Sequence, residues 1–94
     1  MAHNQLGAIY GDARNLDRAV QHYREAVQLD EQAGNLYGAA QTRFNVAIAL
    51  LKANRREDAL EYAEAALRGF ESYGERAAAD IEDTRRLIAA IRGA

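Results

Sequence analysis

Two groups of side chains in this sequence have the types and spacing that chemistry requires. Asp58, Glu61 and Glu64 place three carboxylates at helical spacing, as acid–base catalysis or cation binding can use. Catalytic carboxylates need surroundings that drive their pKa values apart, and an exposed helix face offers none. His22 and Glu25 stand three residues apart, a spacing that can serve a metal, but no second such pair accompanies them. We expect both groups to be solvated surface residues.

Other reactive arrangements are weaker still. The only serine, Ser72, has no histidine near it in sequence, and no glycine-rich phosphate loop is present. The arginine pairs at 55–56 and 85–86 are too short to form a nucleic-acid patch, and no aromatic residues interleave them. The chain has no cysteine, which excludes disulfides and thiolate chemistry. The sequence predicts a protein that is not an enzyme, with no cofactor, no metal site and no nucleic-acid partner.

Composition and length restrict the fold class. The chain has 94 residues, a net charge of −2, a hydrophobic fraction of 49% and no proline, which together favour one small all-α domain. It lacks the apolar run of about 18 residues that a membrane span needs, and its first residues do not resemble a secretory signal. We therefore expect a cytoplasmic protein with no membrane partner, or a fragment of a longer chain.

The stretch 36–51 predicts a helix that is apolar on most of its circumference. One face of it is formed by residues that recur at steps of three and four, namely Ala39, Ala40, Arg43, Val46, Ala47 and Leu50. A second apolar stripe at positions 44, 48 and 51 is rotated away from the first, so one neighbour cannot cover both. The helix therefore needs neighbours on two sides or has an open apolar groove. A single buried helix in a small bundle would show the same wide pattern, and only the rest of the chain can distinguish these possibilities.

The remaining periodicity predicts five helices, at 4–13, 16–33, 36–51, 56–73 and 76–92. Between the first two, a turn at 11–15 would use Asn15 as an N-cap or in a left-handed conformation. Gly34 and Asn35 form a stop signal, and Asn54 is the residue most tolerant of positive φ in the next turn. Gly69 lies inside the fourth helix at a cost of about 1 kcal/mol relative to alanine, so we expect it to permit a close backbone approach.

Two parts of the chain resemble each other when the sequence is shifted by forty residues. The second predicted helix then matches the fourth, and Gly34 falls on Gly74. The matching residues are Ala19, Val20, Ala26 and Val27 with Ala59, Leu60, Ala66 and Leu67. Such a period is typical of a solenoid, in which each helix-turn-helix unit buries its apolar face against the next.

At these residues the chain resembles the tetratricopeptide repeat family. The pattern is intact in the first unit, with Leu6 and Gly7 followed by Tyr10, Ala19, Tyr23 and Ala26 at the spacing of the family. The resemblance implies antiparallel helix pairs stacked as a short right-handed solenoid of five helices. It divides the single domain 1–94 into an N-terminally truncated first repeat at 1–33, a second repeat at 34–73 and a capping helix at 75–92. The proline that closes each unit of the family is replaced by glutamate, which allows longer helices.

The resemblance also implies a binding surface, because the first helix of each unit in this family lines a concave groove. Carried over by position, the wall is apolar in its middle and basic toward its C-terminal end. That combination suits a ligand with hydrophobic anchors and a carboxylate, which arginine can hold with two parallel hydrogen bonds. Its residues are Gln41, Phe44, Asn45, Ile48, Leu51, Lys52, Arg85, Arg86 and Arg92.

Two functions stay open at this point. In the first, the chain is a non-enzymatic module that binds a peptide or partner helix in the groove. In the second, it is a structural or self-associating segment of a larger bacterial signalling or transcription regulator, and the rest of that protein or a second copy covers the stripe at 44, 48 and 51. Terminal repeats normally need polar caps, so a homo-oligomer would form through the N-terminal face or the groove.

Overall fold

The computed structural model describes residues 13–93, and side chains from residue 16 onward. Within this range all the regular structure is helical, which confirms the predicted all-α class. The prediction of five helices is not matched there, because the described residues form four α-helices and one short 3-10 helix. The predicted helix at 4–13 and the N-terminal face lie outside the described residues, apart from Ala13. The elements are α2 (Ala13–Gln32), α3 (Leu36–Lys52), α4 (Arg56–Glu71), η1 (Gly74–Ala77) and α5 (Ala78–Gly93).

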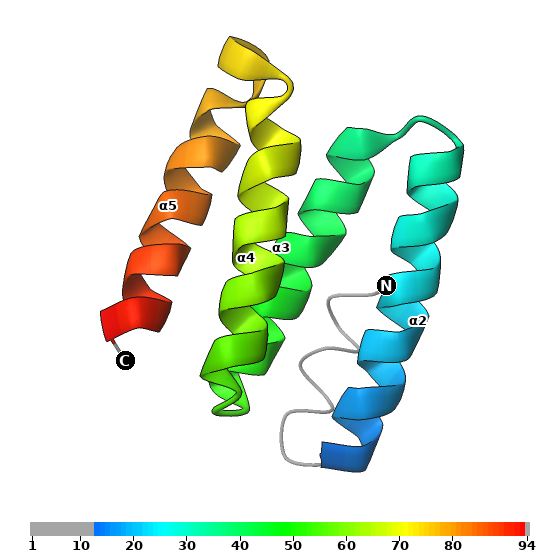
Figure 1. The fold of residues 1–94 in the computed structure, drawn as a ribbon, viewed down its shortest axis with the longest axis vertical. Coiled ribbons are helices and arrows are strands. Elements are labelled where there is room, and N and C mark those ends of the chain that lie inside the picture. The colour runs from blue at the N-terminus through cyan, green and yellow to red at the C-terminus, as the bar shows by residue number, and fades with distance from the viewer. Residues whose placement is uncertain (1–12, 94) are drawn as a thin grey trace.

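The helices run up and down in sequence, and α3 and α4 form the centre of the molecule. Figure 1 shows α4 in front of α3, with α2 beside them at one edge and α5 at the other. The contact between α3 and α4 is the most extensive, followed by the contacts of α5 with α4 and of α2 with α3. The radius of gyration is 12.7 Å. This order makes α3 the helix that needs apolar residues on more than one side, as its sequence predicts.

The helix boundaries differ from the prediction at three places. The predicted turn at 11–15 is wrong at its C-terminal end, because α2 already begins at Ala13 and includes Asn15. Asparagine costs only a fraction of a kcal/mol within a helix, and the buried Leu16 that follows ties this turn to the core. At the other end of the chain, α4 stops at Glu71, and the segment predicted to start the last helix is the 3-10 helix η1.

Three residues with positive φ separate the helices. Gly34 has φ of 78°, Asn54 of 67° and Gly74 of 61°, so the expectation that Asn54 takes the left-handed conformation is confirmed. The stop signal at Gly34 and Asn35 is also confirmed, and Asn35 starts the next helix as well. Its side-chain oxygen accepts a hydrogen bond from the backbone N–H of Gly38 at 3.0 Å, which satisfies one of the free amides at the start of α3.

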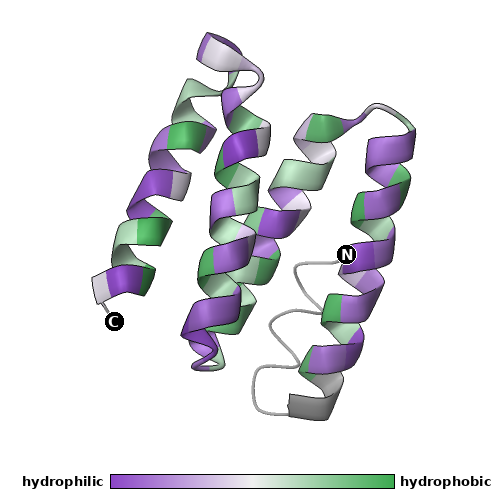
Figure 2. Ribbon diagram, in the orientation of Figure 1, coloured by the Kyte–Doolittle hydropathy of each residue, from purple (hydrophilic) through white to green (hydrophobic). Residues whose placement is uncertain are grey.

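The core divides into two clusters along the α3–α4 contact. One lies around Val46, Leu50 and Ile91, and the other around Ala40 and Phe70. Figure 2 shows hydrophobic and hydrophilic positions alternating along each helix, as expected for helices that bury one side. Every alanine that α3 and α4 bury is fully inaccessible to solvent, so the core around these two helices contains many very small side chains. These are Ala39, Ala40, Ala47, Ala49, Ala59, Ala63 and Ala66.

Gly69 lies in the contact between α4 and α3, where it faces Ala40. A Cβ atom added at Gly69 would lie 2.9 Å from the Cβ of Ala40, closer than real Cβ contacts. The expectation that this glycine permits a close approach is therefore confirmed. Its low helix propensity is tolerated because the backbone of α4 reaches α3 at this point.

We predict that Gly69→Ala destabilises the protein although alanine is the better helix former. Alanine restores about 1 kcal/mol of helix propensity, but overpacking against Ala40 costs about 1–3 kcal/mol. We expect a net loss of about 1 kcal/mol in the free energy of unfolding, measured by urea denaturation followed by circular dichroism. Gly93→Ala is the matched control, because a Cβ at Gly93 meets nothing within 4 Å. A Gly69→Ala variant as stable as the wild type would contradict the close contact.

Candidate functional site

A cleft of about 270 Å³ opens between α3 and α5. Gln41, Phe44 and Asn45 line it from α3, and Asp80 and Asp83 line it from the facing side of α5. The ring of Phe70 from α4 lies at its base and is only 2% exposed. We call this site the α3–α5 cleft. It exists because α3 and α5 both pack against α4 while making few contacts with each other.

The wall of the cleft on α3 continues as an apolar stripe. Phe44, Ile48 and Leu51 follow one another at steps of four and three, and each is half-buried. Phe44 packs against the cluster around Phe70, and Leu51 packs against the cluster around Leu50. The inner edge of this stripe therefore belongs to the core, and its outer edge is available to a partner.

Tyr37 fixes the position of α5 relative to α3. Its hydroxyl donates a hydrogen bond to Oδ2 of Asp80 at 2.5 Å, and its backbone N–H donates one to the hydroxyl of Tyr73 at 3.0 Å. The ring of Tyr37 makes edge contacts with Phe70 and Tyr73, with centroids 5.5 and 5.6 Å away. The guanidinium of Arg76 lies over the ring of Tyr73 at 5.2 Å. This aromatic cluster holds one carboxylate of the cleft in a fixed place.

The pKa of Tyr37 is raised above its ordinary value of 10.0. The main cause is the hydrogen bond to the Asp80 carboxylate, and the negative charge of that carboxylate adds to it. Both favour the protonated phenol, since a tyrosinate could not donate the bond and would repel Asp80. The phenol of Tyr37 therefore keeps the proton that it donates to Asp80 throughout the neutral pH range.

The predicted groove residues fall into two groups in the structure. Gln41, Phe44 and Asn45 line the α3–α5 cleft, with Ile48 and Leu51 beside them and Lys52 exposed at the end of α3. The three arginines predicted for the basic wall do not line this cleft. They form ion pairs elsewhere, Arg85 with Glu71 at 3.6 Å, Arg86 with Glu82 at 3.6 Å and Arg92 with Glu64 at 3.2 Å. Their role in binding remains a prediction.

Tyr37, Asp80 and Asp83 were not among the predicted site residues. Shifting the groove positions of α3 by forty-one residues leads to Arg85 and its neighbours on α5. These residues lie on the edge of α5 that is equivalent to the cleft edge of α3. The wall that faces back toward α3, however, comes from the opposite edge of α5. The three-residue spacing of Asp80 and Asp83, which puts both on one side of a helix, was the available signal.

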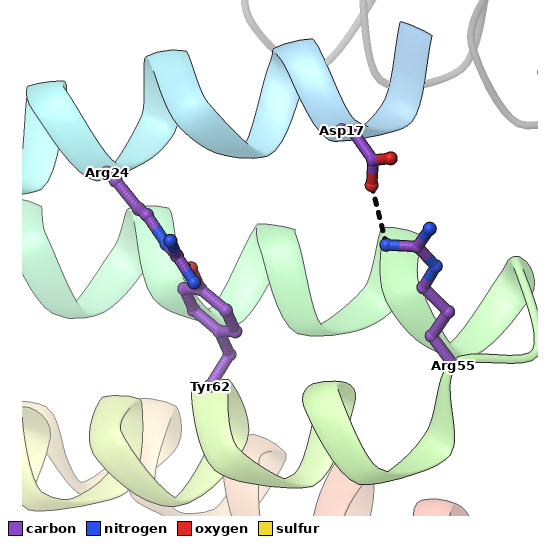
Figure 3. A network of polar contacts seen from close by, with 4 residues as sticks. All are labelled: Asp17, Arg24, Arg55 and Tyr62. Carbon is purple, nitrogen blue, oxygen red and sulfur yellow. Dashed lines mark hydrogen bonds and ion pairs between the residues drawn. The ribbon is translucent and has the colours of Figure 1, made fainter. Parts of the chain in front are cut away.

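A second pocket, of about 490 Å³, lies between α2 and α4 and contains polar contacts between them. Asp17 pairs with Arg55 at 2.7 Å, and Nε of Arg24 donates to the hydroxyl of Tyr62 at 2.8 Å (Figure 3). This hydrogen bond is the main reason why the pKa of Arg24 is raised. Asp58 and Glu61, two of the three carboxylates considered above, line this pocket and are exposed, as expected for solvated side chains.

The largest pocket, of about 670 Å³, lies between the start of α4 and the end of α5. Three arginines line it, but all of them already have partners. Arg56 donates to the backbone oxygens of Ile91 and Arg92, both at 3.2 Å, and so caps the C-terminal end of α5. Arg55 and Arg92 are engaged in the ion pairs described above. These arginines stabilise the fold and do not form a ready anion site.

Among the described residues 13–93, no group of three or more histidine, aspartate or glutamate side chains is arranged to hold a metal ion. His22 is exposed on α2. No helix within residues 13–93 has the length and apolar character needed to cross a membrane.

A family model described as tetratricopeptide repeat matches residues 1–72, which is more than half of the chain. No curated protein and no solved structure matches significantly.

We predict that Tyr37→Phe lowers stability by removing one hydrogen bond while keeping the ring contacts with Phe70 and Tyr73. The folded protein holds the phenol proton more tightly than the unfolded chain does. The extra stability of the wild type over the Tyr37→Phe variant is therefore fully present below pH 10.0, the ordinary pKa of tyrosine. It is lost as the pH rises through the raised pKa of Tyr37. Thermal unfolding at neutral and strongly alkaline pH measures both effects.

The control for this variant is Tyr62→Phe, which removes an exposed hydrogen bond to Arg24. We expect it to lower the unfolding temperature less than Tyr37→Phe does. Equal unfolding temperatures for Tyr37→Phe and the wild type at neutral pH would show that the bond to Asp80 does not hold α5 in place.

Proposed function

We propose, since the chain belongs to the tetratricopeptide repeat family, that it is a non-enzymatic module that binds a peptide or partner helix along the α3–α5 cleft. Tetratricopeptide repeats generally mediate protein–protein interaction. The observation that carries the proposal is the stripe of Phe44, Ile48 and Leu51, which is half-buried and adjoins a cleft with polar walls. Recognition of a peptide requires such a combination, in which apolar contacts supply affinity and a few polar groups fix orientation.

The arrangement of helices that we propose for the whole domain is a short right-handed solenoid. Its first repeat would span 1–33, its second 34–73, and the segment 75–92 would act as the capping helix. The close contact of α3 with α4 and the flanking positions of α2 and α5 support this arrangement. The absence of cysteine fits a reducing compartment, and we propose a cytoplasmic location.

The second candidate function is a structural segment that packs against a further helix or a second copy. It is favoured by an equivalence between the two largest pockets. Three residues of α2 and α3 line the pocket beside α4. Adding forty to the two α2 positions and forty-one to the α3 position gives three residues that line the α4–α5 pocket. The first set is Asp17, Val20 and Leu50. The second is Glu57, Leu60 and Ile91. The α4–α5 pocket is thus the position in which the next helix of an array would lie.

The peptide-binding function predicts that peptides selected from a random displayed library on the full chain occupy the cleft. Asn45→Trp places a large ring at the exposed rim of the cleft, and we expect it to weaken binding of the selected peptides by about tenfold or more. Gln28→Trp introduces the same ring at an exposed position on α2 and should leave binding unchanged. Titration calorimetry measures both. Equal binding by the two variants, or no selectable peptide, would contradict the proposal.

The structural function makes a different prediction, which sedimentation equilibrium tests. If the α4–α5 pocket receives a second copy, the wild type self-associates, and Leu60→Glu, which puts a charge into that pocket, makes it monomeric. Leu51→Glu, on the α3 stripe, should then leave self-association intact. Circular dichroism establishes that both variants stay helical. A wild type that is monomeric even at millimolar concentration would eliminate self-association, and a monomeric Leu51→Glu variant would move the contact to α3.

A further inference from the structure

The α3–α5 cleft has an uncompensated negative charge. Among the residues that line it are two carboxylates and two side-chain amides, and none of the lining residues is basic. The carboxylate of Asp83 is exposed and forms no hydrogen bond or ion pair with any other residue in the range 16–93. Asp80 uses one oxygen to accept the hydrogen bond of Tyr37. The cleft therefore offers acceptors for hydrogen bonds and a field that attracts cations.

The arginines of η1 and α5 form no ion pair with these carboxylates. Arg85 and Arg86 follow Asp83 on α5, but they pair with Glu71 and Glu82. Arg76 lies over the ring of Tyr73. Within residues 16–93 no cation pairs with Asp80 or Asp83, so both carboxylates can receive one from a partner.

Size and lining restrict what can enter. A volume of about 270 Å³ lies below the ~300–1,000 Å³ of most small-molecule sites, and it suits one long side chain of a partner. The half-buried ring of Phe44 offers an apolar face on which the stem of a long basic side chain can pack, with its charge near the carboxylates. The guanidinium of arginine has donors in a planar fork and can bond to two carboxylates at once, whereas lysine presents a single point charge.

Asp80 is already fixed in position before any partner binds. The hydroxyl of Tyr37, on α3, donates a hydrogen bond to the side chain of Asp80. The backbone oxygen of Asp80 accepts a hydrogen bond from Thr84 Oγ1 at 2.6 Å. Thr84 is fully buried. Because the carboxylate is held in one place, a ligand loses less free energy to ordering the site than it would with a mobile side chain.

From these observations we propose that the α3–α5 cleft binds an arginine side chain of a partner peptide, with Asp83 and Asp80 as its acceptors and Phe44 beneath its stem. This rests on the proposed peptide-binding function and defines the chemistry of the ligand. Ile48 and Leu51 follow Phe44 along α3, so apolar residues adjoin the arginine in the partner. The ligand is thus basic and apolar, in contrast to the acidic ligand predicted from the arginines of α5.

The test uses two labelled hexapeptides that differ at one position, with arginine or glutamate preceding two leucines. Fluorescence anisotropy with the full chain gives their affinities. We expect the arginine peptide to bind about tenfold more tightly, an advantage that falls as salt is added because the contact is electrostatic. Equal affinity, preference for glutamate or no binding of either peptide would overturn the proposed arginine site.

Two variants locate the effect. Asp83→Asn removes a charge from the cleft at an exposed side chain without a structural partner, and we expect it to weaken binding of the arginine peptide about fivefold. Asp58→Asn makes the same chemical change on the exposed surface of α4 and should have almost no effect. An unchanged affinity for the Asp83→Asn variant would overturn the proposal.

The two hypotheses fail in different ways. If library-selected peptides bind and Asn45→Trp blocks them, but they show no preference for arginine, the peptide-binding function stands and the arginine site is wrong. If Asn45→Trp has no effect on any peptide, the cleft is not the binding surface and both are wrong.

Discussion

The contact between α3 and α4 determines the rest of the structure. It includes a close approach at Gly69, whose missing side chain lets α4 reach Ala40, and both helices bury many alanines. Small residues bury little area each, so the contact depends on close packing along the whole interface. At Gly69 and Ala40 the two backbones lie too near each other to hold a large side chain between them. Large apolar residues pack elsewhere, some of them buried, as Leu50 and Phe70 are, and others half-buried, as Phe44 and Leu60 are.

Most of the fold could be predicted because its signals are local. The steps of three and four along 36–51 identify α3 and its buried face, and residues that tolerate positive φ mark the ends of the helices at Gly34, Asn54 and Gly74. The boundaries of α2 and α4 could not be predicted as well. The burial of Leu16 extends α2 through Asn15, and the 3-10 helix η1 forms where the chain must turn between the aromatic residues at the end of α4 and the start of α5.

The candidate site was only half predictable, and the reason is geometric. Residues on α3 could be assigned to a face from their own periodicity, and Gln41, Phe44 and Asn45 do line the cleft. The facing wall depends on how α5 is rotated about its axis when it packs on α4. That rotation is set by tertiary contacts, chiefly the burial of Thr84, Ile88 and Ile91. Internal repetition gives equivalent positions along the chain, but not which edges of two neighbouring helices face each other.

The same rotation decides the charge of the cleft. With a net charge of only −2, the chain has no overall field to select a partner, so selectivity must come from local arrangement. The arginines of α5 lie where they can reach Glu71 and Glu82, while Asp80 and Asp83 turn toward α3. Exposed ion pairs of this kind contribute little to stability, on the order of 0–1 kcal/mol each. By pairing the arginines away from the cleft, however, they leave its carboxylates without a cation. The packing that places Ile88 and Ile91 in the core thus also gives the cleft its negative charge, which links the stability of the fold to the chemistry of its ligand.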